Sequence, residues 1–213
     1  MVQNRGVIVR GHAVSLFDRS GVMLEPWRDA GHTCWQVDIA HTKKGWPPDG
    51  INQIQHDLST PWLPPFDRSE IVFVAAFPPC DHLAVSGARW FKGKGLRKLA
   101  ESVQLFATAA EFCEWAGAPY LIENPVSTIS TYWRKPDHTF QPWEYAGLEP
   151  EDNYNKRTCL WTGGGFVMPD PSPLADGGEP DNRIWEMAPG PERAALRAET
   201  PRGFAVAVHR ANS

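Results

Sequence analysis

Cysteine is scarce in this sequence, and no two cysteines lie close together. The four cysteines occupy positions 34, 80, 113 and 159, and none belongs to a CxxC pair. This spacing excludes a disulfide-rich scaffold and offers no zinc-binding motif. We therefore expect reduced thiols and no bound metal.

The chain also lacks a long apolar run and an excess of positive charge. No stretch approaches the length of a membrane-spanning helix, and the N-terminal MVQNRGVIVRGHAVSLF lacks the layout of a signal peptide. The net charge is -4, so contact with a nucleic acid would have to come from a local basic patch. We expect a cytoplasmic protein with no membrane partner, built as a single domain over residues 1–213.

Short apolar segments alternate along the chain with helical patterns. The run KLAESVQLFATAAEFCEWAG (98–117) has apolar residues at 99, 103, 106, 107, 110 and 113 and ends on glycine, which predicts a helix. A short helix closed by Gly31 and one or two C-terminal helical pieces that separate near Pro201 are also predicted. Strands or short extended elements are predicted at 13–17, 32–40, 51–59, 71–77, 118–125 and 156–164, and mainly loops at 132–150 and 165–190. This alternation predicts an α/β fold with a mostly parallel, doubly wound sheet and helices on both faces.

A cysteine follows the most apolar of these predicted strands. In FVAAFPPCDHLAVSGARWF (73–91), the strand stops at Pro78 and Pro79, so Cys80 is expected at its carboxyl end. Ligands bind at that edge of an open α/β sheet. A free cysteine is more often a small buried apolar side chain, so its position alone leaves both interpretations open.

Acidic residues follow three successive extended segments. They are Asp18, Asp38 and Asp57. A glycine-containing first turn, followed about 20 residues later by an acid, is typical of a site that holds a ribose, and Asp38 is the candidate. Aspartates at such positions are also common turn formers.

A glutamate, Glu123 in LIENP, stands at the tip of the strand predicted near the one that ends at Cys80. A partly desolvated carboxyl group there can hydrogen-bond a heterocycle and carry a proton. If Cys80 attacks an electron-poor ring carbon while Glu123 holds the ring, the chemistry is covalent activation of a pyrimidine.

The order of three motifs resembles that of the DNA cytosine-5 methyltransferases. The motifs are SLFDRSG (15–21), FPPC (77–80) and ENP (123–125). In that family, the proline-cysteine motif supplies the nucleophile that adds to C6 of cytosine, and the glutamate-asparagine motif supplies the acid that contacts the base. The resemblance implies a Rossmann-like methyltransferase fold, S-adenosyl-L-methionine as the cofactor and DNA, single- or double-stranded, as the substrate. We also expect a monomer.

The resemblance further implies roles for individual residues. Cys80 is the nucleophile and Glu123 the base-recognising acid. KRTCLW (156–161) matches the family's later basic strand, so Lys156 and Arg157 are catalytic candidates, of which a strand would turn only one into the site. The implied cofactor site comprises Phe17, Asp18, Ser20, Gly21, Asp38, Ile39, Asp57, Leu58 and Pro78. TPRGFAVAV (200–208) resembles the segment that completes the cofactor pocket.

The chain departs from the family pattern in two places. Arg19 stands in the cofactor turn where the family has glycine, and it could crowd the methionine end of the cofactor or project outward. The proline- and glycine-rich residues 162–192 stand in place of a large target-recognition region, as in the short enzymes of this type encoded by bacteriophages and prophages. We therefore expect low sequence selectivity or a preference for single strands, in a bacterial or phage-infected cell.

A basic stretch with three glycines follows Cys80. It contains Arg89, Lys92, Lys94 and Arg97, which we predict to contact nucleic acid, and an aromatic pair, Trp90 and Phe91, able to stack or wedge. An enzyme that attacks C6 must flip the base out of a duplex or use single strands. The other interpretation of this stretch is a solvated basic helix start.

Three other functions remain open from the sequence. The first is C5 modification of cytosine in RNA or in a free nucleotide. The second is a non-catalytic cofactor- or DNA-binding relative, for which Arg19 is the only hint. The third is a cysteine hydrolase that uses Cys80 and His82, for which no orienting residue can be assigned.

Overall fold

A seven-stranded sheet forms the centre of the computed structural model. The structure describes the chain except for residues 1–9, 43–49, 86–92, 94, 189 and 191–195. The strands are β1 (His12–Leu16), β2 (Thr33–Asp38), β3 (Ile51–Gln55), β4 (Ile71–Ala76), β5 (Tyr120–Pro125), β6 (His138–Phe140) and β7 (Thr158–Gly163). Their order in the sheet is β3-β2-β1-β4-β5-β7-β6. The first five strands pair in parallel, whereas β7 runs antiparallel to β5 and β6.

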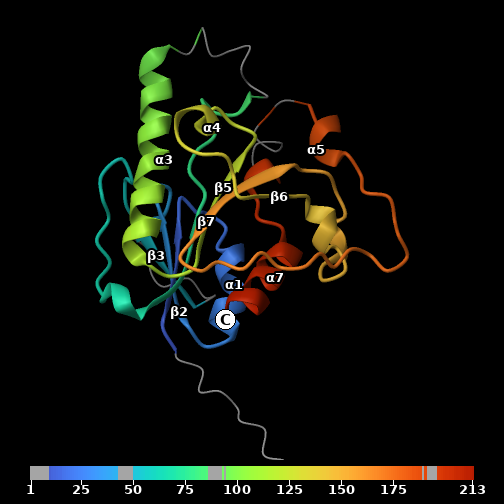
Figure 1. Cartoon of the computed structure of the whole chain (residues 1–213), viewed down its shortest axis with the longest axis horizontal. Coiled ribbons are helices and arrows are strands. Elements are labelled where there is room, and N and C mark those ends of the chain that lie inside the picture. Colours follow the sequence, from blue (N-terminus) through green and yellow to red (C-terminus); the bar gives the residue numbers. More distant parts are fainter. Residues whose placement is uncertain (1–9, 43–49, 86–92, 94, 189, 191–195) are drawn as a thin grey trace, which may run out of the picture.

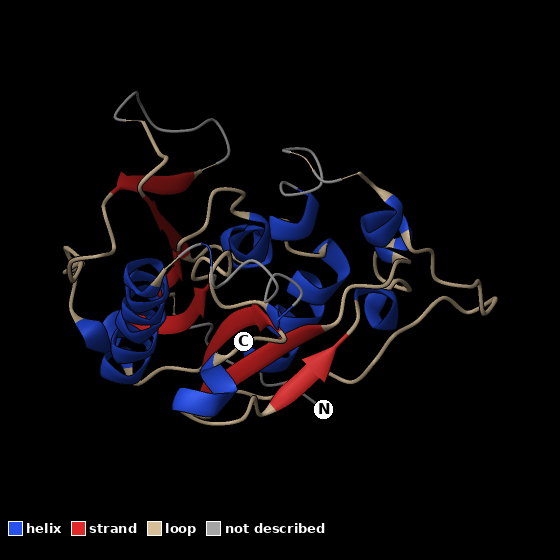
Figure 2. Cartoon of the chain, turned by 90° about the horizontal axis from the view of Figure 1, so that it is seen from above, coloured by secondary structure: helices blue, strands red, loops and turns tan. Residues whose placement is uncertain are grey.

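Helices cover both faces of this sheet, as Figure 1 and Figure 2 show from two directions. On one face, α3 (Leu96–Ala116) packs on β4 and β5; on the other lie α1 (Glu25–Asp29) and α7 (Arg202–Asn212). Side chains of a strand alternate between faces, so Val14 of β1 enters the α3 layer and Ala13 the α1 and α7 layer. Because both faces are covered, the central strand β4 is apolar throughout. The predicted doubly wound, mostly parallel α/β fold is confirmed.

The long helix α3 matches the predicted helix closely. It ends at Gly117, which adopts the left-handed conformation with φ of 70°. Phe106, Ala110 and Cys113 of the predicted apolar stripe are buried, but Ala107 is exposed because it lies beside the seam that faces the sheet. The other helices are short: η1 (Val22–Leu24), η2 (Arg68–Glu70), α4 (Ile129–Tyr132), η4 (Pro142–Tyr145), η5 (Pro150–Asp152) and α5 (Arg183–Glu186).

The last two strands differ from the prediction. β6 lies inside the segment 132–150, which was predicted as loop; its three residues are too few to show an alternation, and it forms because it pairs with β7. The predicted strand 156–164 begins only at Thr158, so Lys156 and Arg157 precede it. The alternation of a strand therefore does not decide which of these two side chains faces the site.

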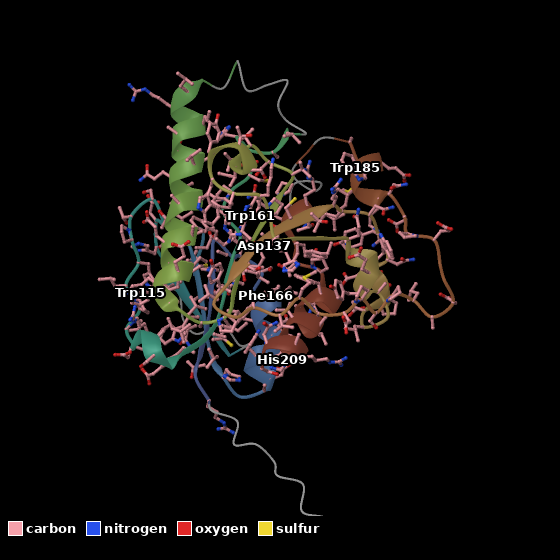
Figure 3. All side chains as sticks on the ribbon, viewed as in Figure 1. Trp115, Asp137, Trp161, Phe166, Trp185 and His209 are labelled. Carbon is pink, nitrogen blue, oxygen red and sulfur yellow. The ribbon has the colours of Figure 1, made fainter. Side chains whose placement is uncertain are left out.

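Side chains outside the sheet fix β7 beside β5. Trp161 is fully buried and packs edge-on against Phe106 of α3, with ring centroids 5.3 Å apart. Its Nε1 donates to the carbonyl of Arg134 at 2.8 Å, and the amide of Thr162 donates to the Asp137 carboxylate at 2.7 Å. Figure 3 labels Trp161 and Asp137 beside this strand. β7 is thereby held in the position that completes the sheet next to β5.

The loop-rich segment predicted at 162–192 folds back on its neighbours. The Tyr145 hydroxyl donates to the carbonyl of Pro169 at 3.0 Å, and the amide of Val167 donates to the Asn212 side chain at 2.8 Å. These bonds attach the segment to η4 and α7. That the whole chain forms one domain, with this segment as a small insertion, stays a prediction.

The C-terminal helix α7 begins on a buried carboxylate. Asp152 accepts a hydrogen bond from the amide of Gly203 at 2.7 Å. A side chain at Gly203 would place its Cβ 2.4 Å from the carbonyl oxygen of Tyr145, so only glycine allows this close approach. The next residue, Phe204, stacks on Phe140 of β6 with ring centroids 3.9 Å apart. The close approach at Gly203 and the stacked rings together hold α7 against β6, at the edge of the sheet.

Asp152 should make stability depend on pH. Its burial raises its pKa from 3.8 to about 6, although the bond from Gly203 opposes the shift. The native state thus binds the proton more tightly than the unfolded chain, so this contribution is present near pH 4 and is lost as pH rises through 6. Between these limits the wild type should lose up to about 3 kcal/mol of unfolding free energy relative to Asp152→Asn, which keeps an oxygen for Gly203.

Urea unfolding at pH 4 and pH 7 measures this difference. Asp170→Asn changes an exposed aspartate and is the matched control, for which we expect no pH-dependent difference from the wild type. A difference in unfolding free energy between the wild type and Asp152→Asn that stays the same from pH 4 to pH 7 would contradict the raised pKa of Asp152.

Candidate active site

Cys80 lies at the carboxyl end of β4, as predicted. The strand ends at Ala76, and the two prolines carry the chain to Cys80, whose carbonyl accepts bonds from the amides of Leu83 and Ala84, both at 2.9 Å. Cys80 is partly exposed, whereas the other three cysteines are buried. Cys113 and the other two therefore serve as core side chains, and Cys80 is the thiol that a ligand can reach.

Glu123 lies on the neighbouring parallel strand and at the same edge of the sheet. Ala76 of β4 pairs with Ile122 of β5, so the chain beyond Ala76 lies beside Glu123. The adjacent Asn124 is fully buried, and its Nδ2 donates to the carbonyl of Pro78 at 2.9 Å. This bond ties the loop that carries the thiol to the strand that carries the carboxyl group.

Backbone bonds continue this connection beyond the two motifs. The amide of Val85 donates to the carbonyl of Val126, and the amide of Thr128 donates to the carbonyl of Leu83, both at 3.0 Å. The loops after Cys80 and after Glu123 therefore form one unit, and the structure brings the predicted nucleophile and acid together.

The surroundings of Cys80 and Glu123 raise the pKa of both groups. Burial raises the pKa of Cys80 to about 11, with help from the charges of Glu123 and Asp81, while Arg197 and Lys156 oppose the shift. Burial also raises the pKa of Glu123, again opposed by Lys156 and Arg197. The resting site therefore favours a neutral thiol beside a carboxyl group that can hold a proton.

Of the two basic candidates, Lys156 lies at the site. Its Nζ donates to the carbonyl of Glu199 at 3.0 Å, and it lines, together with Glu123 and Thr158, a cavity of about 10 Å³, room for about one water. Arg157 is exposed, and its charge acts on the pKa of Cys159, which it lowers against the larger effect of burial. Only Lys156 is beside Glu123.

The predicted cofactor turn follows β1 and is held by Asp18. The buried Asp18 carboxylate oxygen Oδ1 accepts bonds from the amides of Ser20 and Gly21, both at 2.9 Å, and from the Ser20 hydroxyl at 3.1 Å. Phe17 and Gly21 both have positive φ, 56° and 73°, which glycine tolerates and phenylalanine rarely adopts. Arg19 is exposed. Asp18 thus shapes the turn through Oδ1, and the turn holds a strained residue at its start.

The acids after β2 and β3 lie at the same edge. Asp38 is buried and accepts a bond from the amide of Ala40 at 2.7 Å, and Ile39 beside it is 61% exposed. Asp57 is exposed, and a bond from the Ser59 amide lowers its pKa. The remaining two predicted cofactor residues, Leu58 and Pro78, are buried.

Within the described residues, most of the buried polar atoms without a hydrogen-bond partner gather in two places. Within the described residues, Ser15 Oγ, Asp18 Oδ2 and Gln36 Nε2 have no hydrogen-bond partner near the first turn. In the two joined loops, and again counting only described residues, His82 Nδ1, Asn124 Oδ1, Ser127 Oγ and Thr128 Oγ1 also have none. Buried polar groups are nearly always satisfied, so these atoms are donors and acceptors available to a polar ligand.

The predicted nucleic-acid residues are only partly within the described chain. Arg89, Lys92 and Lys94 lie outside the described residues, as do Trp90 and Phe91. Arg97 is exposed in the first turn of α3. Contact with DNA stays a prediction for all four basic residues.

Neither a metal cluster nor a membrane span is found in the described part of the chain. Among those residues, no group of three or more His, Cys, Asp or Glu side chains is placed to hold a metal ion. In the same part, every helix is too short or too polar to cross a membrane.

Sequence reasoning missed two residues that the structure places at this edge, Asn124 and His41, and a third, Arg197, whose charge acts on the pKa of Cys80. Asn124 was noted in the ENP motif without a role, although it joins the two loops. His41 is buried and its Nε2 contacts the Asp18 carbonyl at 3.0 Å. Arg197 comes from the segment before α7, and nothing in the local sequence of that segment distinguishes it.

Comparisons with known proteins identify no family. No protein-family model matches the chain, and no curated protein matches it in sequence. Among solved structures, it is similar to the glycopeptide N-methyltransferase MtfA complexed with S-adenosyl-L-homocysteine, at a TM-score of 0.29 and 16% identity. The matched region covers 75% of this chain and 59% of that chain. This is a weak structural similarity to a methyltransferase.

The bond from Asn124 to Pro78 should control access to Cys80. Asn124→Ala leaves a carbonyl without its partner and should cost about 1–3 kcal/mol of unfolding free energy. The loosened loop should raise the rate at which iodoacetamide alkylates Cys80 at pH 8 severalfold. Mass spectrometry of the modified peptide measures that rate.

Asn52→Ala is the matched control, because Asn52 Nδ2 donates to the Cys34 carbonyl at the same distance, 2.9 Å, in the sheet. It should lose comparable stability and leave the alkylation rate of Cys80 unchanged. Alkylation of Asn124→Ala at the wild-type rate would show that the bond does not restrain the loop.

Proposed function

We propose that this protein methylates C5 of cytosine in DNA, with S-adenosyl-L-methionine as the methyl donor, through a covalent bond between Cys80 and C6. The observation that carries the proposal is the thiol–carboxyl pair: Cys80 follows β4, Glu123 lies in the adjacent parallel strand β5, and Asn124 ties their segments together. A reachable thiol beside a buried acid suits attack on a ring that the acid holds.

Each residue of the pair has a distinct task. Cys80 loses its proton and its sulfur forms a bond to C6, which moves electron density to C5. Burial raises the pKa of Glu123, so its carboxyl group can carry a proton, donate a hydrogen bond to the ring nitrogen and so stabilise part of the developing charge. The bound cofactor would supply the methyl group that C5 takes. Loss of the C5 proton to a base and of the Cys80 sulfur then restores the aromatic ring.

The residues near β1 and β2 fit the proposed cofactor. The unpartnered Asp18 Oδ2 offers an acceptor to an ammonium or hydroxyl group, and Asp38 is placed at the end of β2 where a ribose binds in folds of this type. Ile39, largely exposed at the same edge, offers an apolar surface to a purine ring. The exposure of Arg19 supports a turn that it does not block, and this favours an enzyme over a non-catalytic relative.

The loop-rich segment 162–192 supports low sequence selectivity or a preference for single strands. The described residues of the segment 162–192 are mostly loop with the one short helix α5, and they attach to η4 and α7. A segment of this kind provides little surface for reading bases in a groove. Cytosine in RNA or in a free nucleotide presents the same ring, so the substrate range separates these alternatives.

Transfer of labelled methyl tests the reaction. S-adenosylmethionine carrying a labelled methyl group is incubated with single-stranded DNA, duplex DNA, RNA and dCTP, and digested products are analysed for 5-methylcytosine. We expect label in 5-methylcytosine of DNA, loss of at least a thousandfold in Cys80→Ala, and near wild-type transfer in Cys113→Ala, whose thiol is buried in the core. Label in RNA or dCTP alone would show that the substrate is RNA or the free nucleotide in place of DNA. No label in any substrate would contradict the proposed methyl transfer.

Cofactor binding is tested separately by calorimetry with S-adenosylhomocysteine. Asp38→Asn keeps an oxygen for the Ala40 amide but removes the charge, and it should weaken binding about tenfold or more, equivalent to about 1.4 kcal/mol. Asp170→Asn, an exposed change far along the chain from the turn, should bind as the wild type does. Equal affinity of Asp38→Asn and the wild type would remove Asp38 from the cofactor site.

A further inference from the structure

Exposed apolar side chains extend from the loops of the candidate site to the short helix α4. Val85 and Val126 are both exposed, and the amide of Val85 donates to the carbonyl of Val126 at 3.0 Å. Tyr132 at the end of α4 is 62% exposed, and Trp133 directly after it is 41% exposed. Single exposed apolar side chains are common, but a group of them beside a site marks a surface that a ligand covers.

α4 follows directly from the loop after Glu123. The amide of Thr128 donates to the carbonyl of Leu83 at 3.0 Å, and the helix begins at the next residue. Tyr132 follows Thr128 by four residues, which is about 6 Å along a helix axis. Figure 1 shows α4 above β5 and beside α3. The exposed aromatic side chains therefore begin about one helical turn from the point where the loops of Cys80 and Glu123 join.

Several contacts fix the ring of Trp133. It packs edge-on against Phe106 of α3, with ring centroids 5.8 Å apart and an interplanar angle of 69°. The guanidinium carbon of Arg134 lies 4.5 Å from the centre of the Trp133 ring, and an ion pair with Asp137 holds that guanidinium. The carbonyl of Arg134 accepts a bond from Trp161, which attaches this segment to β7. A ring held in this way loses little conformational freedom when a ligand stacks on it.

Positive charge accompanies the two rings. Arg134 and Lys135 follow Trp133 in the chain, and Lys135 is exposed. In the described part of the chain, Arg134 is paired with Asp137, whereas Lys135 takes part in no ion pair. The whole chain carries a net charge of -4, so a cation beside exposed rings is a local feature. Exposed rings next to cations suit single-strand binding, because bases stack on the rings and the cations attract the phosphates.

The position of these side chains favours a nucleic acid strand as the occupant. A cytosine that reaches Cys80 and Glu123 brings its neighbouring nucleotides with it, so their bases arrive beside α4. In a duplex, the neighbouring base pairs cover the face of each base, so only an unpaired strand offers a base face to a ring. A protein partner would cover the rings too, but it would also crowd the approach to Cys80.

We propose that Tyr132 and Trp133 form a stacking surface for the bases that flank the target cytosine in single-stranded DNA, with Lys135 as the cation for a neighbouring phosphate. This inference rests on the proposed function, because it takes the bound strand to be the one whose cytosine reaches Cys80. It favours single strands over duplex DNA as the substrate. Stacking accepts the face of any base, so the surface agrees with low sequence selectivity.

Binding of a fluorescein-labelled DNA strand of about 12 nucleotides, measured by anisotropy without cofactor, tests this surface. Tyr132→Ala and Trp133→Ala should each weaken binding about fivefold or more, equivalent to about 1 kcal/mol, since each removes a ring on which a base stacks. Tyr132→Phe keeps the ring and should bind as the wild type does. The duplex of the same sequence should bind more weakly than the strand, and tighter binding of the duplex would overturn the assignment to single strands.

Trp115→Ala is the matched control for Trp133→Ala. Trp115 is 39% exposed and contacts Phe112 of α3 with ring centroids 5.4 Å apart, so the two tryptophans have similar surroundings. Figure 3, in the view of Figure 1, labels Trp115 at the end of α3 that is farther from α4. This control should bind the strand with wild-type affinity. An equal loss in the two variants would show that binding does not depend on the surface at α4, and the proposal would be overturned.

An abasic strand separates stacking from attraction between charges. It has the same phosphates without the bases, so the wild type should bind it more weakly and Tyr132→Ala should cause no further loss. A loss of the same size with the abasic and the normal strand would show that the ring of Tyr132 does not stack on a base, and this too would overturn the proposal.

The salt dependence of binding tests Lys135. Lys135→Met should weaken binding and lower the slope of log affinity against log salt by about 0.7, the value for one phosphate contact on a single strand. Arg210→Met removes an exposed positive charge from α7 and should keep the wild-type slope. An unchanged slope in Lys135→Met would overturn the role given to this residue.

Folding and self-association are checked for every variant. If Trp133→Ala fails to fold by circular dichroism, Trp133→Leu is measured in its place against the same expectation, since leucine keeps an apolar contact with Phe106 but has no ring. If the variants bind the strand as the wild type does but sediment differently, the surface is an interface between protein chains and the proposal is overturned.

The outcome is separate from that of the methyl-transfer assay, because binding is measured without cofactor. A protein that transfers no methyl group but binds strands through Tyr132 and Trp133 keeps the stacking surface and loses only the proposed reaction. Conversely, an active enzyme whose Tyr132→Ala and Trp133→Ala variants bind the strand as the wild type does would overturn this inference alone.

Discussion

The pairing of β4 with β1 on one side and β5 on the other is the constraint on which the candidate site depends. Leu16 lies opposite Ala76, and Ala76 opposite Ile122, so β1 and β4 end level with Ile122 while β5 continues beside β7 to Pro125. The cofactor turn, the Cys80 loop and the Glu123 strand end come from distant parts of the sequence and meet only because of this register. The buried bond from Asn124 to Pro78 then fixes the distance between the last two.

Burial is the main cause of the raised pKa values of Cys80 and Glu123. Moving a thiol and a carboxyl group out of water disfavours their charged forms, and the raised pKa values of Cys80 and Glu123 report this. A thiol that stays neutral at rest reacts slowly with electrophiles, and a carboxyl group with a raised pKa can carry a proton in the proposed reaction. The charges of Lys156 and Arg197 oppose both shifts.

The parts of this arrangement that sequence predicts are those with local causes. The stripe and terminal glycine of α3, and the prolines that place Cys80 after β4, act within a few residues. β6 was not predicted because three residues are too few to show the alternation of a strand. The direction of β7 depends on the path of the chain that leads to it. The choice between Lys156 and Arg157 depended on contacts outside β7, since both residues precede that strand. The effect of Arg197 on the pKa of Glu123 could not be predicted, because this residue is far from both strands in the sequence.

The C-terminal segment links the two halves of the site. α7 packs on α1 and η1, which follow directly from the cofactor turn, while the residues just before it line the cavity beside Glu123. The ion pair of Arg202 with Glu25 and the bond from Gly203 to Asp152 sit at the junction. A shift of α7 would therefore move the support of the turn and the wall beside Glu123 together. Because Asp152 titrates near pH 6, the junction is anchored by a group whose charge changes near neutrality. One helix thus holds the predicted cofactor turn and the loop-and-strand unit of Cys80 and Glu123 in a fixed relation.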